Sequence, residues 1–223
     1  MYIKIENSGF KVLPTNSNLE PIKVDTSAIS TTSSTLFETI KIENKKVANL
    51  NYHQKRVDLA FKNLFKTKPN FTLKDALKNH PTDNLYRAKI VYNKDGLQSC
   101  SYYIYSKKII KTIALVEITD FNYNYKYTNR ELFLHLQNSM PQFDEFLITQ
   151  NGYLKDTTIA NIALLDSSTN LWHTPEVALL DGTTKERYIN DNKLIKKMIH
   201  FRNLKNYTTI ATLNAMVGFN ILR

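Results

Sequence analysis

Short strands separated by turns are the pattern of the first hundred residues. Residues 1–5 and 36–42 are strand-like, because apolar or β-branched side chains recur there between polar ones. Two further strand-like runs, 86–92 and 101–105, flank Asn93-Lys-Asp-Gly96, a sequence typical of a hairpin connection. This part of the chain therefore predicts antiparallel pairing.

The apolar spacing becomes helical after residue 50. Within 51–65, Val57 and Phe61 stand one helical turn apart, so we expect a helix there. A second, shorter helix is predicted over 72–78, with Thr72 as its N-terminal cap. Residues 16–34 are rich in Ser, Thr, Asn and Pro and predict turns and loop.

A change in composition at Lys107-Lys108 marks a predicted domain boundary. It divides the chain into a small domain, 1–107, and a larger one, 108–223. In the second part we expect helices over 128–139 and 183–189, and strands over 109–118, 143–149, 159–165, 171–172 and 208–212. Thr128 and Thr183 stand as predicted caps, each with Glu three residues later. The predicted fold is α+β, with two mixed α/β parts.

Composition excludes several classes of protein. With 223 residues and 42% hydrophobic residues, the chain can bury proper cores and is not of the disordered type. No apolar run has the length of a membrane span, and Met1-Tyr-Ile-Lys-Ile-Glu6 is too short and charged for a signal peptide. The single cysteine, Cys100, excludes an internal disulfide. We therefore expect a cytoplasmic protein and, since Cys and His show no ligand spacing, no metal.

The net charge of +10 keeps a nucleic-acid-binding function open. Such a function predicts charge gathered on one face, whereas the lysines here are spread along the chain. The same charge would favour the approach of a small anionic substrate.

Lys126 is a candidate nucleophile. Tyrosines flank it in the segment 121–130, and an ammonium packed among aromatic rings has a lowered pKa. A neutral amine can form a Schiff base with a carbonyl compound. On this segment alone an ordinary surface lysine is the better interpretation.

Anion- and ring-binding groups follow at other points of the chain. Arg56, one turn from His53, could grip a phosphate, although a solvated helix charge is commoner. Asp156 could pair with a protonated pyridine nitrogen, or could be a turn residue. Gly182, which allows an unusual backbone angle, and Thr183 open a predicted helix whose N–H groups could bind phosphate, or only be capped.

The order of these segments resembles the class IV, or fold-type IV, aminotransferase family, which depends on pyridoxal 5'-phosphate. The resemblance covers about residues 36–220. Its segments are Leu36-Phe-Glu-Thr-Ile40 with His53-x-x-Arg56, Lys126-Tyr-Thr-Asn-Arg130, Leu154-Lys-Asp-Thr-Thr-Ile-Ala-Asn161, His173-Thr-Pro175, Leu179-Leu-Asp-Gly-Thr-Thr184 and Thr212-Leu-Asn-Ala-Met216.

The resemblance implies a role for each matching residue. Lys126 would form the Schiff base with the cofactor and shuttle protons, and Asp156 would face the pyridine nitrogen, where the family usually has Glu. Asn161 would support the ring side of the pocket. The implied phosphate ligands are Arg56, Thr183, Thr184 and Asn214. The family further implies the D-amino-acid aminotransferase-like architecture and a homodimer.

Departures from the family pattern bear on the reaction. Lys185 stands where arginine is common, and Ser30-Thr-Thr-Ser-Ser-Thr35 replaces an acidic, glycine-rich run. The stretch 97–101 lacks the Arg-x-His pair of the D-amino-acid enzymes. Asn214-Ala-Met216 and the Lys-x-x-Asn-Arg pattern look closest to aminodeoxychorismate lyase, which releases pyruvate and forms 4-aminobenzoate for folate synthesis.

Lyase is thus the expected activity, and a branched-chain or other class IV aminotransferase is the alternative. A catalytically degenerate relative stays open because of Lys185 and the shortened N-terminal region.

Overall fold

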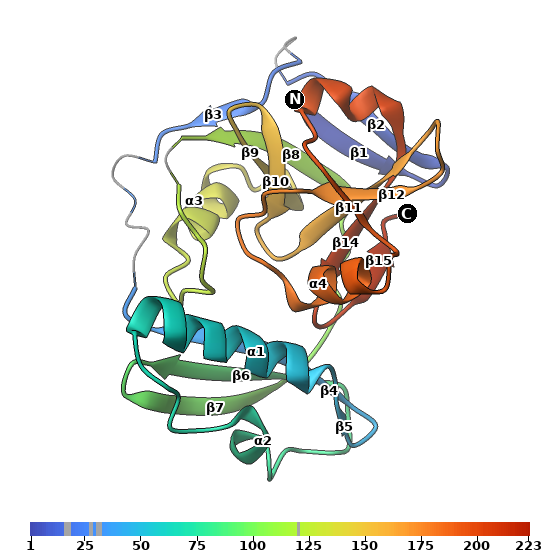
Figure 1. Ribbon diagram of the computed structural model, residues 1–223. Coiled ribbons are helices and arrows are strands. Elements are labelled where there is room, and N and C mark those ends of the chain that lie inside the picture. Colours follow the sequence, from blue (N-terminus) through green and yellow to red (C-terminus); the bar gives the residue numbers. More distant parts are fainter. Residues whose placement is uncertain (16–18, 27–28, 30–32, 120) are drawn as a thin grey trace. The chain divides into compact units, whose positions relative to one another are not determined.

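The chain forms two compact units, each described here by itself (Figure 1). The computed structural model describes residues 1–223 except 16–18, 27–28, 30–32 and 120. The larger unit comprises residues 1–30, 108–122 and 130–223, and the smaller unit comprises 31–107 and 123–129. The sequence-based division at 107/108 therefore differs from the structure in two segments, 1–30 and 123–129.

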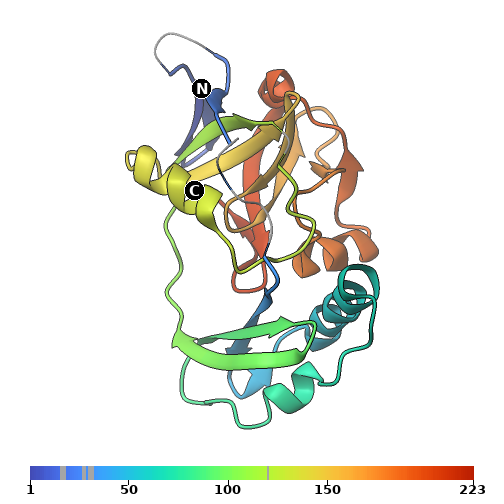
Figure 2. The same cartoon turned by 90° about the vertical axis from the view of Figure 1, so that its left-hand side faces the viewer.

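The smaller unit is an antiparallel sheet with helix α1 against it (Figures 1 and 2). The strands, in spatial order, are β5 (Lys46–Val47), β4 (Leu36–Glu43), β6 (Tyr86–Asn93) and β7 (Gly96–Ile104). The helices are α1 (Leu50–Ala60), a π-helical continuation (Phe61–Phe65) and α2 (Leu73–Ala76). β4 pairs with β5 and β6 pairs with β7, and the second of these hairpins is the one predicted at Asn93–Gly96.

Local sequence explains where these helices begin. The Thr72 side chain accepts a hydrogen bond from the Asp75 N–H at 3.1 Å, so the predicted cap of α2 is confirmed. Asn49 precedes α1 with a φ of 52°, in the left-handed region that Asn tolerates. The chain turns there, so β5 ends at Val47 and α1 begins at Leu50.

An aromatic cluster fills the core of the smaller unit. Phe61 and Tyr92 are fully buried, and their ring centroids lie 6.0 Å apart. Phe65 and Phe71 add ring contacts to Phe61 at 5.2 and 6.0 Å. Pairs of this kind contribute about 0.5–1.5 kcal/mol each beyond the area they bury, so this cluster fixes the helix on the sheet.

Two sheets build the larger unit. The first has the order β10 (Tyr153–Thr157), β9 (Glu145–Gln150), β8 (Thr112–Ile118), β1 (Tyr2–Glu6), β2 (Gly9–Leu13), with β3 (Ile22–Val24) also paired to β8. The second has the order β13 (Ile195–Lys197), β12 (Trp172–Pro175), β11 (Asn161–Asp166), β14 (Tyr207–Asn214), β15 (Gly218–Ile221). The remaining elements are α3 (Glu131–Ser139), α4 (Thr183–Asn190) and a 3₁₀ helix (Phe201–Asn206).

One apolar cluster joins the two sheets. It contains fully buried side chains of both, among them Ile3, Ile113 and Leu147 of the first sheet and Ile162 and Ile210 of the second. Each such side chain contributes roughly 1.5–3 kcal/mol when it leaves water. Because Ile3 on β1 pairs with Ile113 on β8, the N-terminal residues fold with the larger unit, which explains the difference at 1–30.

Several strands were missed by the sequence analysis. β2, β10, β13 and β15 were not expected, and β3 lies within the predicted loop 16–34. These strands are at most five residues long, and most carry polar or exposed side chains, so local patterns do not distinguish them from loop. Partner strands supply the missing information. Among the described residues, no helix has the length and apolar character needed to cross a membrane.

Candidate active site

The Lys126 segment lies along β4 in the smaller unit. The Phe37 N–H donates to the Lys126 carbonyl at 2.9 Å, and the Thr128 N–H donates to the Thr35 carbonyl at 3.0 Å. The hydroxyls of Thr35 and Thr128 are also 2.5 Å apart. The segment 123–129 is thus held at the edge of β4, which places its backbone firmly.

Thr128 was predicted to cap helix α3, and this is wrong. The helix begins at Glu131, with Arg130 at the capping position and no side-chain cap. Thr128 is instead engaged with Thr35, 93 residues earlier in the chain. A long-range hydroxyl pair therefore replaces a local capping box.

The Lys126 side chain is half-buried beside an aromatic ring. Its Nζ lies 4.6 Å from the ring centroid of Phe37, the β4 residue whose N–H binds the Lys126 carbonyl. The flanking Tyr123 is buried and donates its hydroxyl to the Tyr127 carbonyl at 2.9 Å. This tyrosine therefore braces the backbone around Lys126.

Arg56 is bound to a buried carboxylate, Glu38 of β4. The Arg56 Nε donates to Glu38 Oε1 at 2.8 Å, and Arg56 Nη2 donates to Oε2 at 2.6 Å. The His53 Nδ1 lies 2.6 Å from the same Oε2. Two hydrogen bonds to Glu38 therefore fix the plane of the Arg56 guanidinium, and Arg56 is not a freely solvated charge on helix α1. Glu38 is part of the family-like segment Leu36–Ile40, but the resemblance implied no role for it.

Charge balance in this cluster decides the protonation of Glu38. Burial alone would raise the pKa of this carboxyl, but the charge of Arg56 and the hydrogen bonds from His53 and Arg56 outweigh it. The result is a pKa of about 2 for Glu38. The carboxylate is therefore ionised at neutral pH.

Asp156 of β10 is a buried carboxylate with three donors around it in the larger unit. Its Oδ1 accepts from Asn161 Nδ2 at 2.7 Å, and its Oδ2 accepts from the N–H groups of Leu179 and Leu180, both at 2.9 Å. Burial raises the pKa of Asp156, and the charge of Lys185 together with these donors opposes the rise. A carboxylate held in this way can accept a further charged donor.

Asn161 links Asp156 to the start of helix α4. Its Nδ2 also donates to the Leu180 carbonyl at 2.9 Å, and its Oδ1 would lie 1.8 Å from a Cβ on Gly182. Gly182 has an ordinary φ of −78°, so the predicted unusual backbone angle is wrong. The glycine is needed because Asn161 fills the space of a side chain.

Helix α4 begins without a side-chain cap. Gly182 is its N-terminal cap, so Thr183 is the first helical residue and the predicted capping box of Thr183 with Glu186 does not form. Thr183 and Thr184 are both buried. An uncapped helix start presents backbone N–H donors, which suits an anion such as phosphate.

Lys185 is buried in the first turn of α4. Its Nζ donates to the Pro175 carbonyl at 2.8 Å, and burial lowers its pKa against the opposing charges of Asp156 and Asp181. A charged donor is thus retained at the position where the resembling family commonly has arginine.

The turn after Asp156 is braced by residues that the sequence analysis did not single out. Glu145, fully buried, accepts hydrogen bonds from the Thr158 hydroxyl and from the Thr158 N–H, the latter at 3.1 Å. Arg130 Nη2 donates to the Thr158 carbonyl at 2.5 Å. Glu145 is the first residue of strand β9. A carboxylate at the start of an apolar run was the sequence signal that could have identified it as a buried functional residue.

Asn214 shapes the turn between β14 and β15. Its Oδ1 accepts from the N–H groups of Met216 and Val217 at 2.9 and 3.0 Å, and its Nδ2 donates to the Ile159 carbonyl at 3.4 Å. Asn214 therefore contacts the same turn that follows Asp156.

The predicted site residues thus fall into two connected groups. In the larger unit, hydrogen bonds and close contacts link Asp156, Asn161, Gly182 at the start of α4, and Asn214 through its turn. In the smaller unit, Lys126 and Arg56 are both held by β4, through Phe37 and Glu38.

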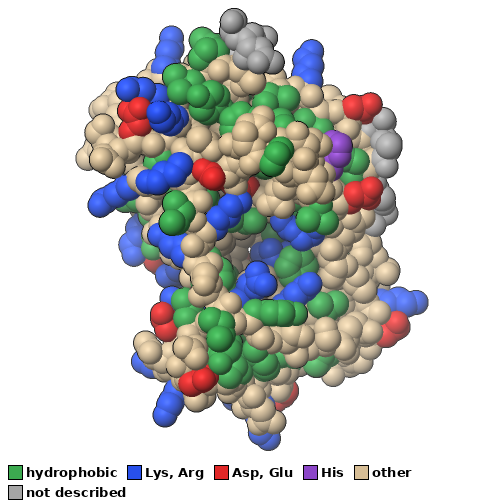
Figure 3. All heavy atoms as spheres, turned by 180° about the vertical axis from the view of Figure 1, so that it is seen from behind, with side chains coloured by type: hydrophobic (Ala, Val, Ile, Leu, Met, Phe, Trp, Pro, Cys, Tyr) green, Lys and Arg blue, Asp and Glu red, His purple; other side chains and the backbone are tan. Residues whose placement is uncertain are grey.

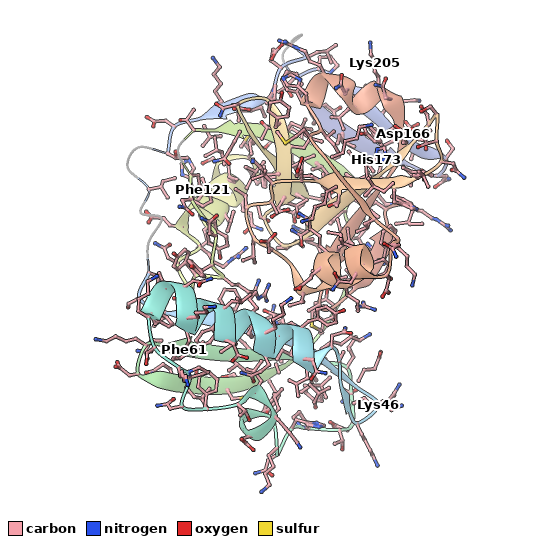
Figure 4. The ribbon with its side chains drawn as sticks, viewed as in Figure 1. Lys46, Phe61, Phe121, Asp166, His173 and Lys205 are labelled. Carbon is pink, nitrogen blue, oxygen red and sulfur yellow. The ribbon has the colours of Figure 1, made fainter. Side chains whose placement is uncertain are left out.

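Another buried acid–base pair lies apart from these groups within the larger unit. Asp166 and His173 are labelled in Figure 4. The His173 Nδ1 lies 3.8 Å from Asp166 Oδ2 and 3.3 Å from the Tyr207 hydroxyl. Asp166 also accepts from Ser168 and Thr169 in its own turn. These contacts fasten the β11–β12 connection and serve the fold.

Comparison with known sequences finds a relative but no family model. No family model matches the sequence. The chain is 32% identical over 187 residues, 82% of its length, to an uncharacterised Haemophilus influenzae protein, of which 98% is covered.

Solved structures share the fold of this chain. A proposed 4-amino-4-deoxychorismate lyase from Haemophilus somnus is similar with a TM-score of 0.76 and 29% identity, over 85% of this chain and 100% of that one. The branched-chain amino acid aminotransferase of Escherichia coli is similar with a TM-score of 0.66 and 13% identity, over 85% and 76%.

Proposed function

Because the chain belongs to the fold-type IV family of pyridoxal-phosphate enzymes, we propose that it is a lyase that cleaves 4-amino-4-deoxychorismate to pyruvate and 4-aminobenzoate. The family is a group of lyases and aminotransferases, and the activity within it is our inference. The observation that carries it is the similarity, along 85% of the chain, to the Haemophilus somnus protein proposed to have this activity.

The residues present fit this cofactor. The uncapped start of α4 offers N–H donors of the kind that bind phosphate. Asp156 is a buried carboxylate of the kind that pairs with a protonated ring nitrogen. When bound, pyridoxal 5'-phosphate supplies an electron sink that stabilises negative charge on the substrate.

Each residue group has a proposed task. Phosphate binding is assigned, following the family resemblance, to Arg56 in the smaller unit and to the N–H groups of Thr183 and Thr184 and Asn214 in the larger unit. Asp156, oriented by Asn161 and by two backbone N–H groups, holds a proton on the ring nitrogen. These hydrogen bonds lie within the larger unit and fix the direction of the Asp156 carboxylate.

Lys126 is the proposed catalytic residue. Its amine would hold the cofactor covalently, and its Nζ would take up and return protons during the reaction. The backbone hydrogen bonds to β4 hold the segment that carries this side chain in place.

The substrate is proposed to be a small dicarboxylate, attracted by the net charge of +10. On the face shown in Figure 3, Lys and Arg side chains occur over both units among hydrophobic, uncharged and acidic side chains. Such a general positive field attracts small anions without requiring one basic patch. Following the family, we also propose a homodimer.

The lyase proposal is tested by pyruvate release. Cofactor-loaded protein and 4-amino-4-deoxychorismate are mixed without any keto-acid acceptor, and pyruvate and 4-aminobenzoate are measured. We expect equal amounts of both products, and a loss of at least 10³-fold in the Lys126→Ala variant, because the attaching amine is missing.

Three other outcomes would overturn the lyase proposal. Turnover of an amino acid that requires a keto-acid acceptor would make the protein an aminotransferase, which the similarity to the Escherichia coli enzyme supports as the second candidate. Cofactor binding without either reaction would make it a degenerate relative. Salt-dependent binding of generic nucleic acid in the absence of both reactions would favour the remaining alternative.

A further inference from the structure

Glu38 lies on the apolar face of strand β4. Leu36, Ile40 and Ile42 share that face with it, since side chains alternate along a strand, and all four are fully buried. A buried carboxylate among aliphatic side chains costs folding free energy unless charged donors surround it. Its retention therefore needs a reason other than packing.

Among the residues that the structure describes, the side-chain donors of Glu38 come from helix α1. Arg56 supplies Nε and Nη2 at 2.8 and 2.6 Å, and His53 supplies Nδ1 at 2.6 Å. The Arg56 side chain is 17% exposed and the His53 side chain 1% exposed, so both lie largely out of solvent. Glu38, Arg56 and His53 form a cluster that we call the β4–α1 charge cluster.

We propose that Glu38 is a positioning residue that orients the Arg56 guanidinium for the phosphate of the cofactor. This inference rests on the proposed function, in which Arg56 binds that phosphate. A fork of two parallel hydrogen bonds fixes both the plane and the direction of a guanidinium. Arg56 is therefore preorganised, and ligand binding does not have to freeze its long side chain.

His53 completes the cluster without adding a second cation. Burial lowers the pKa of this imidazole, and the charges of Arg56 and Lys126 lower it further, against the opposing effect of Glu38. The lowered pKa leaves His53 neutral at neutral pH. Its Nδ1 faces an ionised carboxylate, so Nδ1 carries the ring proton and donates it to Glu38. The cluster thus holds one anion and one cation, and Glu38 is aligned by a neutral third member.

The test compares two ligands that differ only in the phosphate. Cofactor-free protein is titrated with pyridoxal 5'-phosphate and with pyridoxal, and each Kd is measured by quenching of intrinsic fluorescence. The variants are Glu38→Gln, Arg56→Ala and their double variant. Glu43→Gln is the matched control, because Glu43 lies on the same strand but is largely exposed and pairs with Lys41.

We expect Glu38→Gln to weaken the binding of pyridoxal 5'-phosphate at least tenfold and that of pyridoxal less than twofold. The double variant should bind pyridoxal 5'-phosphate no more weakly than Arg56→Ala, because Glu38 acts through Arg56. Glu43→Gln should change neither. If Glu38→Gln does not fold, Glu38→Asp keeps the charge at a shorter reach, and we expect a smaller loss that is again confined to the phosphorylated ligand.

Equal weakening of both ligands in the folded Glu38 variants, or no weakening, would overturn the positioning role. If Arg56→Ala itself leaves the ratio of the two affinities unchanged, the phosphate assignment of the proposed function fails. A changed ratio in Arg56→Ala but not in the Glu38 variants refutes the positioning role alone.

Discussion

Single residues in this protein act through the space and the donors around them. Gly182 shows this, because its backbone angle is ordinary while Asn161 Oδ1 fills the place of a side chain. Asn161 in turn binds Asp156 and the Leu180 carbonyl. The sequence placed Asp156, Asn161 and Gly182 among the site residues through a resemblance. Their mutual contacts could not be predicted, because they depend on chain segments about 20 residues apart.

Gly182→Ala should therefore disturb Asp156 through Asn161. The new methyl group would displace the Asn161 amide and break its hydrogen bonds, so we expect a loss of about 1–3 kcal/mol in the free energy of unfolding. Urea denaturation measures this value. In an Asn161→Ala background the same change should cost much less, since the clashing atom is gone. An equal cost in both backgrounds would contradict this explanation.

At the scale of elements, long regular segments followed their sequence patterns, whereas most of the short strands did not. β4, β6 and helix α1 were predicted to within a few residues, because apolar spacing and turn residues agree there. The caps predicted at Thr128 and Thr183 did not form. At Thr128 the partner Thr35 is 93 residues away, and a local capping rule cannot include it.

The contact between β4 and α1 should make stability sensitive to acid. The pKa of Glu38, about 2 in the folded protein, is below its ordinary value of 4.5. Glu38 therefore stabilises the fold above pH 4.5, and this stabilisation, about 3 kcal/mol, is lost as the pH falls toward 2. The lowered pKa of His53 acts in the same direction, since this imidazole takes up a proton more readily once unfolded.

Urea denaturation between pH 6 and pH 3 tests this acid sensitivity. Glu38→Gln should be less stable at pH 6, because Arg56 loses its counter-charge, and its stability should fall less steeply toward pH 3 than that of the unchanged protein. Glu43→Gln should keep the original slope. Parallel pH curves for the unchanged protein and Glu38→Gln would contradict the role given to Glu38.

For the whole molecule, the division into units is not continuous along the chain. Residues 1–30 join the larger unit because β1 pairs with β8, and residues 123–129 join the smaller unit through β4. A composition change at Lys107-Lys108 marks one boundary, but pairings across about 90 to 110 residues leave no local signal. Lys126 consequently lies in the smaller unit, whereas the sequence analysis assigned it to the second half of the chain.

The central claim is that Lys126 is the residue that binds the cofactor covalently. Protein loaded with pyridoxal 5'-phosphate is reduced with borohydride and digested, and the modified peptide is identified by mass spectrometry. We predict that the cofactor mass is on the peptide containing Lys126 and is absent from Lys126→Ala. Attachment at another lysine, such as the buried Lys185, or no attachment in folded, cofactor-supplied protein, would contradict the claim.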